Sequence, residues 1–404
     1  MPPGVPVLNA CSDRYRFAVG LAACLVSNRP NLLPPNHTAA IIRHLQRSAP
    51  GTICLTDERN CDIGLPQLRF PQATAKRAAQ WPAPQIPGQQ LVAEVFTSGS
   101  TGTPVPHRKT WERLTRCVLI GASRLNFDVT RPKTIVATVP PQHMYGLESS
   151  VLMSLQSGAS FCAERPFYPI DICNVLASAP RPRILVSTPV HLRALLATDL
   201  PLPDLDMIIS ATSPITEEFA GVVEQRFGAP LIEIYGSTET GQIANRQPTR
   251  SREWHLWTGV RLTKRGDRIW AEGGHIESPT PLGDNVELVG DAHFVLGSRL
   301  QDLVNIAGKR NSIAYLNYQL LSIAGVRDGA FFLPEEASDT NIGVARLSAV
   351  VVAPGLDVAT VLRHLRERID PVFLPRPLLL VNAMPRDNTG KLPLQTLRSL
   401  LGRR

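Results

Sequence analysis

One short stretch decides the fold of this chain: Phe96-Thr97-Ser98-Gly99-Ser100-Thr101-Gly102-Thr103-Pro104. It follows an apolar, β-branched run, Leu91-Val92-Ala93-Glu94-Val95, which predicts a strand that ends where the small residues begin. Glycines let main-chain N–H groups approach an anion closely, and the hydroxyls add donors, so the loop is a candidate phosphate cradle. The absence of a Gly-Lys-Ser/Thr ending argues against an ordinary P-loop NTPase. The pattern also misses Gly-x-Ser-x-Gly by one position, because Ser98 stands where the first glycine would be.

A loop of this composition can also be a solvated linker, and three later segments decide between the two interpretations. They are Tyr235-Gly-Ser-Thr-Glu-Thr-Gly241, Gly297-Ser-Arg-Leu-Gln-Asp-Leu-Val-Asn-Ile-Ala-Gly-Lys-Arg310 and Pro385-Arg-Asp-Asn-Thr-Gly-Lys391. In this order, the four segments resemble the motifs of the adenylate-forming superfamily. That superfamily includes acyl- and aryl-CoA synthetases, the adenylation domains of peptide synthetases, and luciferases.

The composition is that of a soluble globular protein of two or more domains. The chain has 404 residues, of which 43% are hydrophobic and 19% charged, and its net charge is +8. Its basic residues are scattered, without a basic run interleaved with aromatics, so we expect no nucleic-acid partner. The positive charge would suit adenosine phosphates or an acidic carrier protein.

The cysteines and the apolar segments indicate a cytoplasmic protein. The seven cysteines are widely spaced and contain no Cys-x-x-Cys pair, which argues against disulfides and zinc sites and for a reducing compartment. The apolar segment 17–26, flanked by Arg14 and Arg16, is too short to span a bilayer. We therefore expect a buried or amphipathic helix there and no stable membrane insertion.

The order of the apolar segments predicts an α/β fold. Strands alternate with helices up to Tyr235; among them are helices predicted at 147–157 and around 169–178 and a strand at 184–188. This alternation predicts a mostly parallel, layered sheet with ligands at the carboxyl ends of its strands. A change to short alternating strands at about 254–296 predicts a small β-rich subdomain. We therefore expect a large layered α/β N-terminal domain over 1–297 and a small α+β lid domain over 298–404, with a hinge near 299–302.

The resemblance implies ATP and Mg²⁺ as cofactors and assigns residues to them. Glu239 is implied to bind Mg²⁺, which prefers carboxylate and phosphate oxygens, although a carboxylate at a helix N-terminus is the ordinary alternative. Tyr235 is implied to stack on adenine, and Thr238 to approach the α-phosphate. The other implied nucleotide-binding residues are Thr97, Ser98, Gly99, Ser100, Thr101, Gly102 and Gly236.

Further residues are implied near the ribose and in the lid. Asp284 resembles the acidic residue that holds both ribose hydroxyls, although an Asp after Gly is also common in turns. Arg299 resembles the second ribose contact, and Gln301 the pivot of the lid. Lys391 matches the catalytic lysine, whose ammonium would stabilise charge that develops during the transfer. The ordinary alternative for Lys391 is a solvated lysine near a chain end.

The same resemblance implies a site for a small carboxylic acid. His143, Tyr145 and Gly146 resemble the segment that lines the acyl pocket and gates entry of the carboxylate, although a lone histidine is more often structural. Ser210 and Ala211 resemble another wall of that pocket. No acidic residue stands out to hold an amino group, so an aromatic or medium-length acyl acid is expected.

One segment departs from the family pattern. The phosphate loop usually continues Pro-Lys-Gly, but here Pro104 is followed by Val-Pro-His-Arg-Lys, which ends at Lys109. Arg108 and Lys109 are the candidates to replace the missing lysine.

The predicted function is an AMP-forming ligation of a carboxylic acid to a thiol. ATP would form an acyl- or aryl-adenylate, and the acyl group would pass to a phosphopantetheine thiol, with an acyl carrier protein as the favoured acceptor. Three alternatives stay open: a synthetase that uses free coenzyme A, a non-catalytic nucleotide-binding descendant, and an oxidative luciferase-like enzyme.

Overall fold

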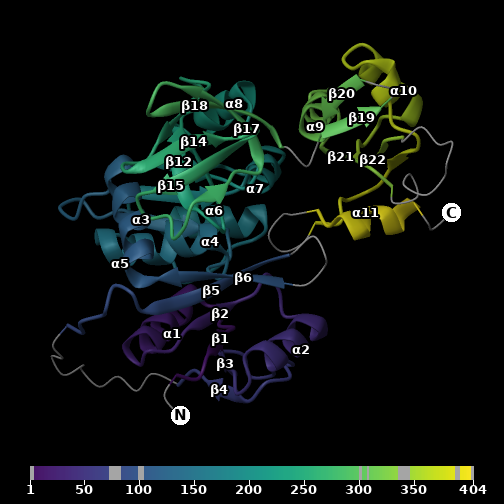
Figure 1. Ribbon diagram of the computed structural model, residues 1–404. Coiled ribbons are helices and arrows are strands. Elements are labelled where there is room, and N and C mark those ends of the chain that lie inside the picture. Colours follow the sequence, from purple (N-terminus) through teal and green to yellow (C-terminus); the bar gives the residue numbers. More distant parts are fainter. Residues whose placement is uncertain are drawn as a thin grey trace. The chain divides into compact units, whose positions relative to one another are not determined.

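The computed structural model describes residues 4–71, 83–98, 104–299, 303–306, 309–334, 346–386 and 392–401. The chain divides into two units (Figure 1): one comprises Met1–Pro281 and Leu288–Val295, the other Leu282–Glu287 and Leu296–Arg404. A large layered α/β unit and a small α+β unit confirm the predicted fold class. The boundary after 297 and the hinge near 299–302 stay predictions, and residues 300–302 lie outside the described residues.

The first unit begins with a six-stranded sheet. In spatial order its strands are β4 (Gln67–Arg69), β3 (Ile53–Thr56), β1 (Val7–Asn9), β2 (Asn31–Leu33), β5 (Leu91–Ser98) and β6 (Pro104–Thr110). Neighbouring strands are parallel except β5 and β6, which are antiparallel. Helix α2 (Ala39–Ser48) packs on this sheet by its apolar stripe, with Ile42 and Leu45 against Leu8 and Leu32.

The apolar segment 17–26 lies within helix α1 (Arg14–Val26), as predicted for a buried helix. Asp13 caps the helix by accepting from the main-chain N–H of Arg16 at 2.8 Å. Phe17 and Leu21 are buried, and the amide of Asn9 in β1 donates to the carbonyl of Phe17 at 2.9 Å. In the described parts of the chain, we find no helix with the length and apolar character that a membrane crossing requires.

A nine-stranded sheet is the largest sheet of the structure and includes most of the remaining strands of the large unit. In spatial order its strands are β17 (Asp284–Val289), β18 (His293–Arg299), β13 (Glu253–Leu256), β12 (Gly241–Arg246), β11 (Leu231–Ser237), β10 (Met207–Ser210), β9 (Arg183–Ser187), β7 (Thr134–Ala137) and β8 (Ser160–Phe161). From β11 to β8 the neighbours are parallel, whereas β11, β12, β13 and β18 pair antiparallel. The carboxyl ends of β7, β9, β10 and β11 therefore lie along one edge of the sheet.

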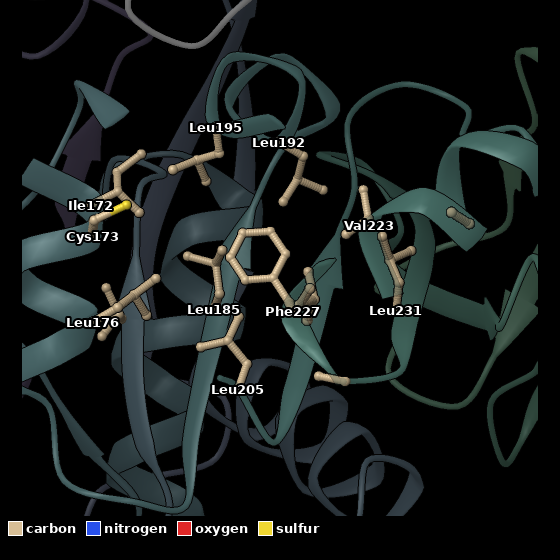
Figure 2. Packing of buried hydrophobic residues seen from close by; sticks show 14 of the residues in the cluster. Ile172, Cys173, Leu176, Leu185, Leu192, Leu195, Leu205, Val223, Phe227 and Leu231 are labelled. Atoms are coloured by element: carbon tan, nitrogen blue, oxygen red, sulfur yellow. The ribbon is translucent and has the colours of Figure 1, made fainter. Parts of the chain in front are cut away.

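Helices α3 (Trp111–Arg124), α6 (Pro169–Ser178), α7 (Pro189–Leu196) and α8 (Glu217–Phe227) belong to this sheet's layers. Figure 2 shows Leu185 of β9 among the buried side chains of α6, α7 and α8, with the ring of Phe227 at the centre. Proline begins α6 and α7, where its missing N–H is not needed. Helix α8 ends at Phe227, and Gly228 caps it with φ +61°.

The helix predicted for 147–157 contains a π-helical segment. α4 (Met144–Gly146), the π-helix η1 (Leu147–Leu152) and α5 (Met153–Ser157) follow one another without a break. Every residue of η1 is buried, including Glu148. π-helical turns often occur at functional sites, and this one places a carboxyl group in the interior of the protein.

Residues 254–296 are shared between two sheets. β14 (Val260–Arg265), β15 (Arg268–Gly273) and β16 (Thr280–Pro281) form a three-stranded sheet of their own. β13, β17 and β18 instead extend the nine-stranded sheet.

The small unit is built on the sheet of β21 (Asp328–Phe332), β22 (Ser348–Val352) and β23 (Leu378–Leu380). Its other elements are β19 (Leu303–Ile306), β20 (Lys309–Ser312), α9 (Ile313–Leu321), α10 (Val358–Arg366), the 3-10 helix η4 (Pro371–Phe373) and α11 (Leu394–Leu401). Side chains alternate between the two faces of the sheet: Phe331 and Val351 pack with α9 and α10, whereas Phe332 and Val350 pack with α11.

Candidate active site

Glu239 lies at the tip of the hairpin that joins β11 to β12. The strands pair as far as Ser237 facing Gly241, so three residues form the loop. Ser237 and Thr240 bind each other across it, with the N–H of each donating to the hydroxyl of the other at 3.1 and 3.2 Å. Gly241 closes the loop with φ +70°, a conformation that glycine adopts without strain. The carboxylate therefore projects from a tightly bonded turn at the carboxyl end of β11.

A strand that was not predicted lies beside this loop. β5 continues past Phe96 to Ser98, and β6 pairs with it so that Thr97 faces Val105. Pro104 and Pro106 argue against a strand in the sequence, but β6 is an edge strand, where a residue without an N–H is tolerated.

Two side chains of β6 contact Glu239. The Nε2 atom of His107 lies 2.9 Å from Oγ1 of Thr97 and 3.5 Å from Oε1 of Glu239. Lys109 donates from Nζ to the main-chain carbonyl of Glu239 at 2.8 Å. Residues 107 and 109 point to the same face of the strand because side chains alternate. Thr97 and Glu239, predicted from separate motifs, are thus brought together through β6.

Lys109 and Arg108 differ sharply in their surroundings. Lys109 is only 4% exposed, and burial lowers the pKa of its amino group. Arg108 points to the other face, where its side chain is 72% exposed and its Nε lies 3.9 Å from Oε1 of Glu94. Of the two candidates to replace the missing lysine, Lys109 is the one that contacts a predicted site residue, and it does so through the main chain of Glu239.

A buried polar cluster lies behind the loop. The carboxylate of Glu148 lies 3.1 Å from Sγ of Cys117, and this thiol also lies 3.7 Å from the carbonyl of Gln242. A Cβ atom at Gly241 would come within 2.8 Å of Oε1 of Glu148, so the glycine allows the carboxylate to approach the hairpin. Burial raises the pKa of Glu148 to about 7, an effect that Lys109 partly offsets. The hairpin therefore packs against a buried carboxyl group whose pKa is near 7.

We predict that Glu148 makes the free energy of unfolding depend on pH and that Glu148→Gln removes this dependence. The folded protein holds the proton of Glu148 up to a pKa of about 7, whereas the unfolded chain releases it near the ordinary value of 4.5. Its stabilising contribution is therefore complete below pH 4.5 and is lost as the pH rises through 7. Relative to Glu148→Gln, the free energy of unfolding of the native protein should fall by roughly 3 kcal/mol over that interval. Urea unfolding of both proteins at several pH values measures the difference, and a constant difference would contradict the prediction.

The predicted acid-binding residues gather at the carboxyl ends of β9 and β10. The Tyr145 hydroxyl donates to the main-chain carbonyls of Ser187 and Ile209 at 3.1 and 3.0 Å. Tyr145 thereby lies beside Ser210 and Ala211, which follow Ile209.

A Cβ atom at Gly146 would overlap the carbonyl of Pro140, so only glycine fits there. His143 precedes α4 and is half-buried.

The end of β10 has two unusual features. The hydroxyl of Ser210 is fully buried and, within the described ranges, has no hydrogen-bond partner. Two residues later, Thr212 has φ +83°, which is uncommon for a β-branched residue. Backbone strain of this kind clusters at functional sites. The predicted pocket wall therefore carries a local strain that the sequence did not indicate.

Tyr235 lies in an aromatic cluster. Its ring centroid is 5.6 Å from those of Trp254 and Phe294, and its side chain is half-buried. Gly236 follows it, and a Cβ atom there would overlap the carbonyl of Gly241, so glycine is required for the bulge in the hairpin. The exposed part of the Tyr235 ring is what would be available for stacking.

Several predicted site residues are not tested by this geometry. Asp284 begins β17 and belongs to the second unit. Thr238 lies in the hairpin loop and is half-buried. The predicted residues that lie outside the described residues, or whose side chains do, are Ser98, Gly99, Ser100, Thr101, Gly102, Arg299, Gln301 and Lys391.

Sequence reasoning missed Arg14, which supports the segment after β7. Arg14 is fully buried in α1 and donates to the main-chain carbonyls of Ala137 and Val139 at 2.8 and 3.0 Å. It also donates to the hydroxyl of Ser150 at 2.7 Å. These contacts hold the chain that leads to His143. No sequence signal marks such a residue, because an arginine in a first helical turn is ordinarily solvated.

His191 was also missed. Its Nδ1 atom lies 3.0 Å from the hydroxyl of Thr188 and 3.3 Å from that of Thr138, at the ends of β9 and β7. Burial lowers the pKa of His191 to about 4, so the imidazole is neutral at physiological pH. The signal that could have found it is position, because it follows the predicted strand at 184–188 by three residues.

Among the known proteins that this chain resembles are CoA ligases and a CoA synthetase. The 4-coumarate–CoA ligase of Rhodobacter capsulatus is 25% identical over 299 residues, which cover 73% of each chain. The 4-chlorobenzoate–CoA ligase of an Arthrobacter species is 26% identical over 382 residues, covering 80% of this chain and 68% of the relative. The solved structure of o-succinylbenzoate CoA synthetase from Bacillus subtilis shares the fold, with a TM-score of 0.80 and 18% identity over 100% of this chain and 89% of that one.

The family model described as AMP-binding enzyme matches residues 16–291, which is most of the large unit. This match confirms the resemblance inferred from the four motifs. It also confirms the enzyme class that the resemblance implies, an AMP-forming acid–thiol ligase. The chain therefore belongs to the family of AMP-binding enzymes.

Proposed function

We propose that this protein uses ATP and Mg²⁺ to convert a small carboxylic acid into an acyl- or aryl-adenylate and pyrophosphate. The acyl group then passes to a phosphopantetheine thiol, and AMP leaves. The observation that carries the proposal is the convergence of Thr97 and Glu239, from two motifs about 140 residues apart in sequence, on the single imidazole of His107. That convergence puts the start of the phosphate loop beside the proposed metal carboxylate.

The residues around Glu239 fit Mg²⁺. Across the described residues, no three His, Cys, Asp or Glu side chains gather to form a complete metal cage. Mg²⁺ does not need one, because it is usually bound by one or two carboxylates together with substrate phosphates and water. The Glu239 side chain is 39% exposed, and His107 connects it to Thr97, at which the proposed phosphate loop begins. When bound, the metal would supply positive charge to the phosphate oxygens.

The remaining predicted residues complete the proposed site. Lys391 would place its ammonium near the α-phosphate and the attacking carboxylate, where negative charge develops. Asp284 and Arg299 would hold the ribose, and the exposed part of the Tyr235 ring would stack on adenine. Gln301 would be the pivot about which the lid rotates between the two half-reactions.

The proposed acid is aromatic or of medium chain length. Tyr145, Ser210 and Ala211 lie together at the carboxyl ends of parallel strands, where ligands of such sheets bind. The relatives named above act, by their names, on 4-coumarate and 4-chlorobenzoate, which supports an aromatic acid. His143 would lie at the entry for the carboxylate.

The proposed acceptor is an acyl carrier protein in the cytoplasm. The net charge of +8 supports an acidic protein partner, and the seven cysteines are all free, which suits a reducing compartment. The second candidate is free coenzyme A, which is favoured by the names of the relatives.

Pyrophosphate release tests this proposal. With ATP, Mg²⁺ and a panel of aryl and aliphatic acids, we expect release with one class of acid and a loss of about 100-fold in Lys391→Ala. Adding coenzyme A or a carrier protein bearing phosphopantetheine then shows which thiol takes the acyl group. Nucleotide binding without release for any acid would favour a non-catalytic binding protein, and acid-dependent oxygen consumption would favour a luciferase-like reaction.

A further inference from the structure

We propose that His107 is a positioning residue that holds the Glu239 carboxylate for Mg²⁺ and directs the Thr97 hydroxyl toward the triphosphate. This inference rests on the proposed function, because it concerns the same site. It assigns a role to His107, a residue of β6 that the sequence motifs did not single out.

Two side chains of β6 hold Glu239 at two points. Lys109 binds its main-chain carbonyl at 2.8 Å, which fixes the backbone of the hairpin tip. A glutamate side chain still has freedom about its own bonds after the backbone is fixed. His107 is the side chain that restricts this freedom, because its Nε2 lies 3.5 Å from Oε1 of Glu239.

The hydrogen bonds of His107 depend on which ring nitrogen carries the proton. His107 can either accept from Thr97 through Nε2 or donate through a proton on Nε2. If it accepted, its nitrogen lone pair would face the carboxylate of Glu239 and repel it. The tautomer with the proton on Nε2 avoids this repulsion, and its N–H is then shared between the oxygens of Thr97 and Glu239. The hydroxyl hydrogen of Thr97 is consequently left to donate to another acceptor, such as a phosphate oxygen.

The segment that departs from the family pattern after Pro104 places His107 and Arg108 on opposite faces of β6. Arg108 lies on the opposite face, exposed and beside Glu94, whereas the flanking residues His107 and Lys109 both face the hairpin. Polar side chains that support metal ligands contribute substantially to metal binding although they do not touch the metal. A half-buried histidine between the phosphate loop and the proposed metal carboxylate fits this supporting role.

Calorimetric binding of ATP, with Mg²⁺ and with EDTA in its place, tests the inference without turnover. We expect His107→Ala to weaken binding of the magnesium complex about 10-fold and to change metal-free binding much less. His107→Gln should retain most of the affinity, since its amide can donate from about the position of Nε2. Val105→Ala is the control on the same strand, because Val105 is exposed, and it should bind as the native protein does. Thermal unfolding checks that each variant is folded.

Combination with Glu239→Gln separates positioning from general packing. If His107 acts through Glu239, His107→Ala should cost little further affinity in the Glu239→Gln background, so the two effects will not add. Additive losses would overturn the inference, as would equal losses with and without Mg²⁺. If the native protein and His107→Ala bind Mg·ATP equally well, the inference is overturned but the proposed function is not. Native protein that binds no Mg·ATP overturns the proposed function as well.

Discussion

Replacing Glu239 by glutamine is expected to slow pyrophosphate release about 1,000-fold while the fold is preserved. Glutamine has nearly the same shape, but it removes the negative charge that the proposed metal site requires. A loss of this size corresponds to about 4 kcal/mol of transition-state stabilisation. The free energy of unfolding should change by no more than about 0.5 kcal/mol, because the side chain is 39% exposed and Lys109 binds only the main chain of this residue. Steady-state pyrophosphate assays over a range of Mg²⁺ concentrations measure the effect.

The matched control for this variant is Glu253→Gln. Glu253 is an exposed glutamate on β13 of the same sheet, and its replacement should leave the rate unchanged. A Glu239→Gln protein that releases pyrophosphate at the native rate would rule out Glu239 as a metal ligand.

Replacing Lys109 by methionine is expected to lower the free energy of unfolding by about 4 kcal/mol. Methionine fills much of the same space, so the loss comes from the amino group rather than from a cavity. The main-chain carbonyl of Glu239 would lose its donor, and the carboxyl groups of Glu148 and Glu277 would lose a nearby positive charge. Buried polar groups left without partners are costly. Chemical unfolding at neutral pH measures the loss.

Lysine 109 should also matter for nucleotide binding. The hairpin tip loses an anchor in Lys109→Met, so Mg·ATP should bind more weakly even where the protein is still folded. Lys264→Met is the control, because Lys264 is exposed on β14 and its loss should affect neither property. Native-like stability of Lys109→Met would show that the buried amino group does not hold the hairpin.

Local patterns predicted many of the elements of the large unit. Helix α6 runs from Pro169 to Ser178, the predicted bounds, because a proline at its start and a periodic apolar face mark it within ten residues. The order of the four motifs likewise predicted the family, which the match over residues 16–291 confirms. Both inferences depend on short segments of sequence that can be recognised without knowledge of the tertiary structure.

Other elements escaped prediction because their cause is not local. The prolines at 104 and 106 argue against a strand, so the sequence does not predict β6. A strand is possible there because β6 lies at the edge of its sheet. The π-helical turn at Leu147–Leu152 was predicted as ordinary helix, since helical periodicity does not distinguish the two over six residues. Nothing near Arg14 in the sequence indicates its burial, which depends on carbonyl groups more than 120 residues away.

The sequence by itself determined the family to which this protein belongs, and it predicted the phosphate loop and the metal-binding role of Glu239. The roles of Lys391 and of the phosphate-loop residues 99–102 stay predictions of that kind. Only the tertiary structure decided how Glu239 is held. Lys109 and Glu239 are 130 residues apart, and their contact exists because the edge strand of one sheet lies beside the β11–β12 hairpin of the other. Propensity and periodicity act over a few residues, whereas such a contact depends on how whole sheets pack.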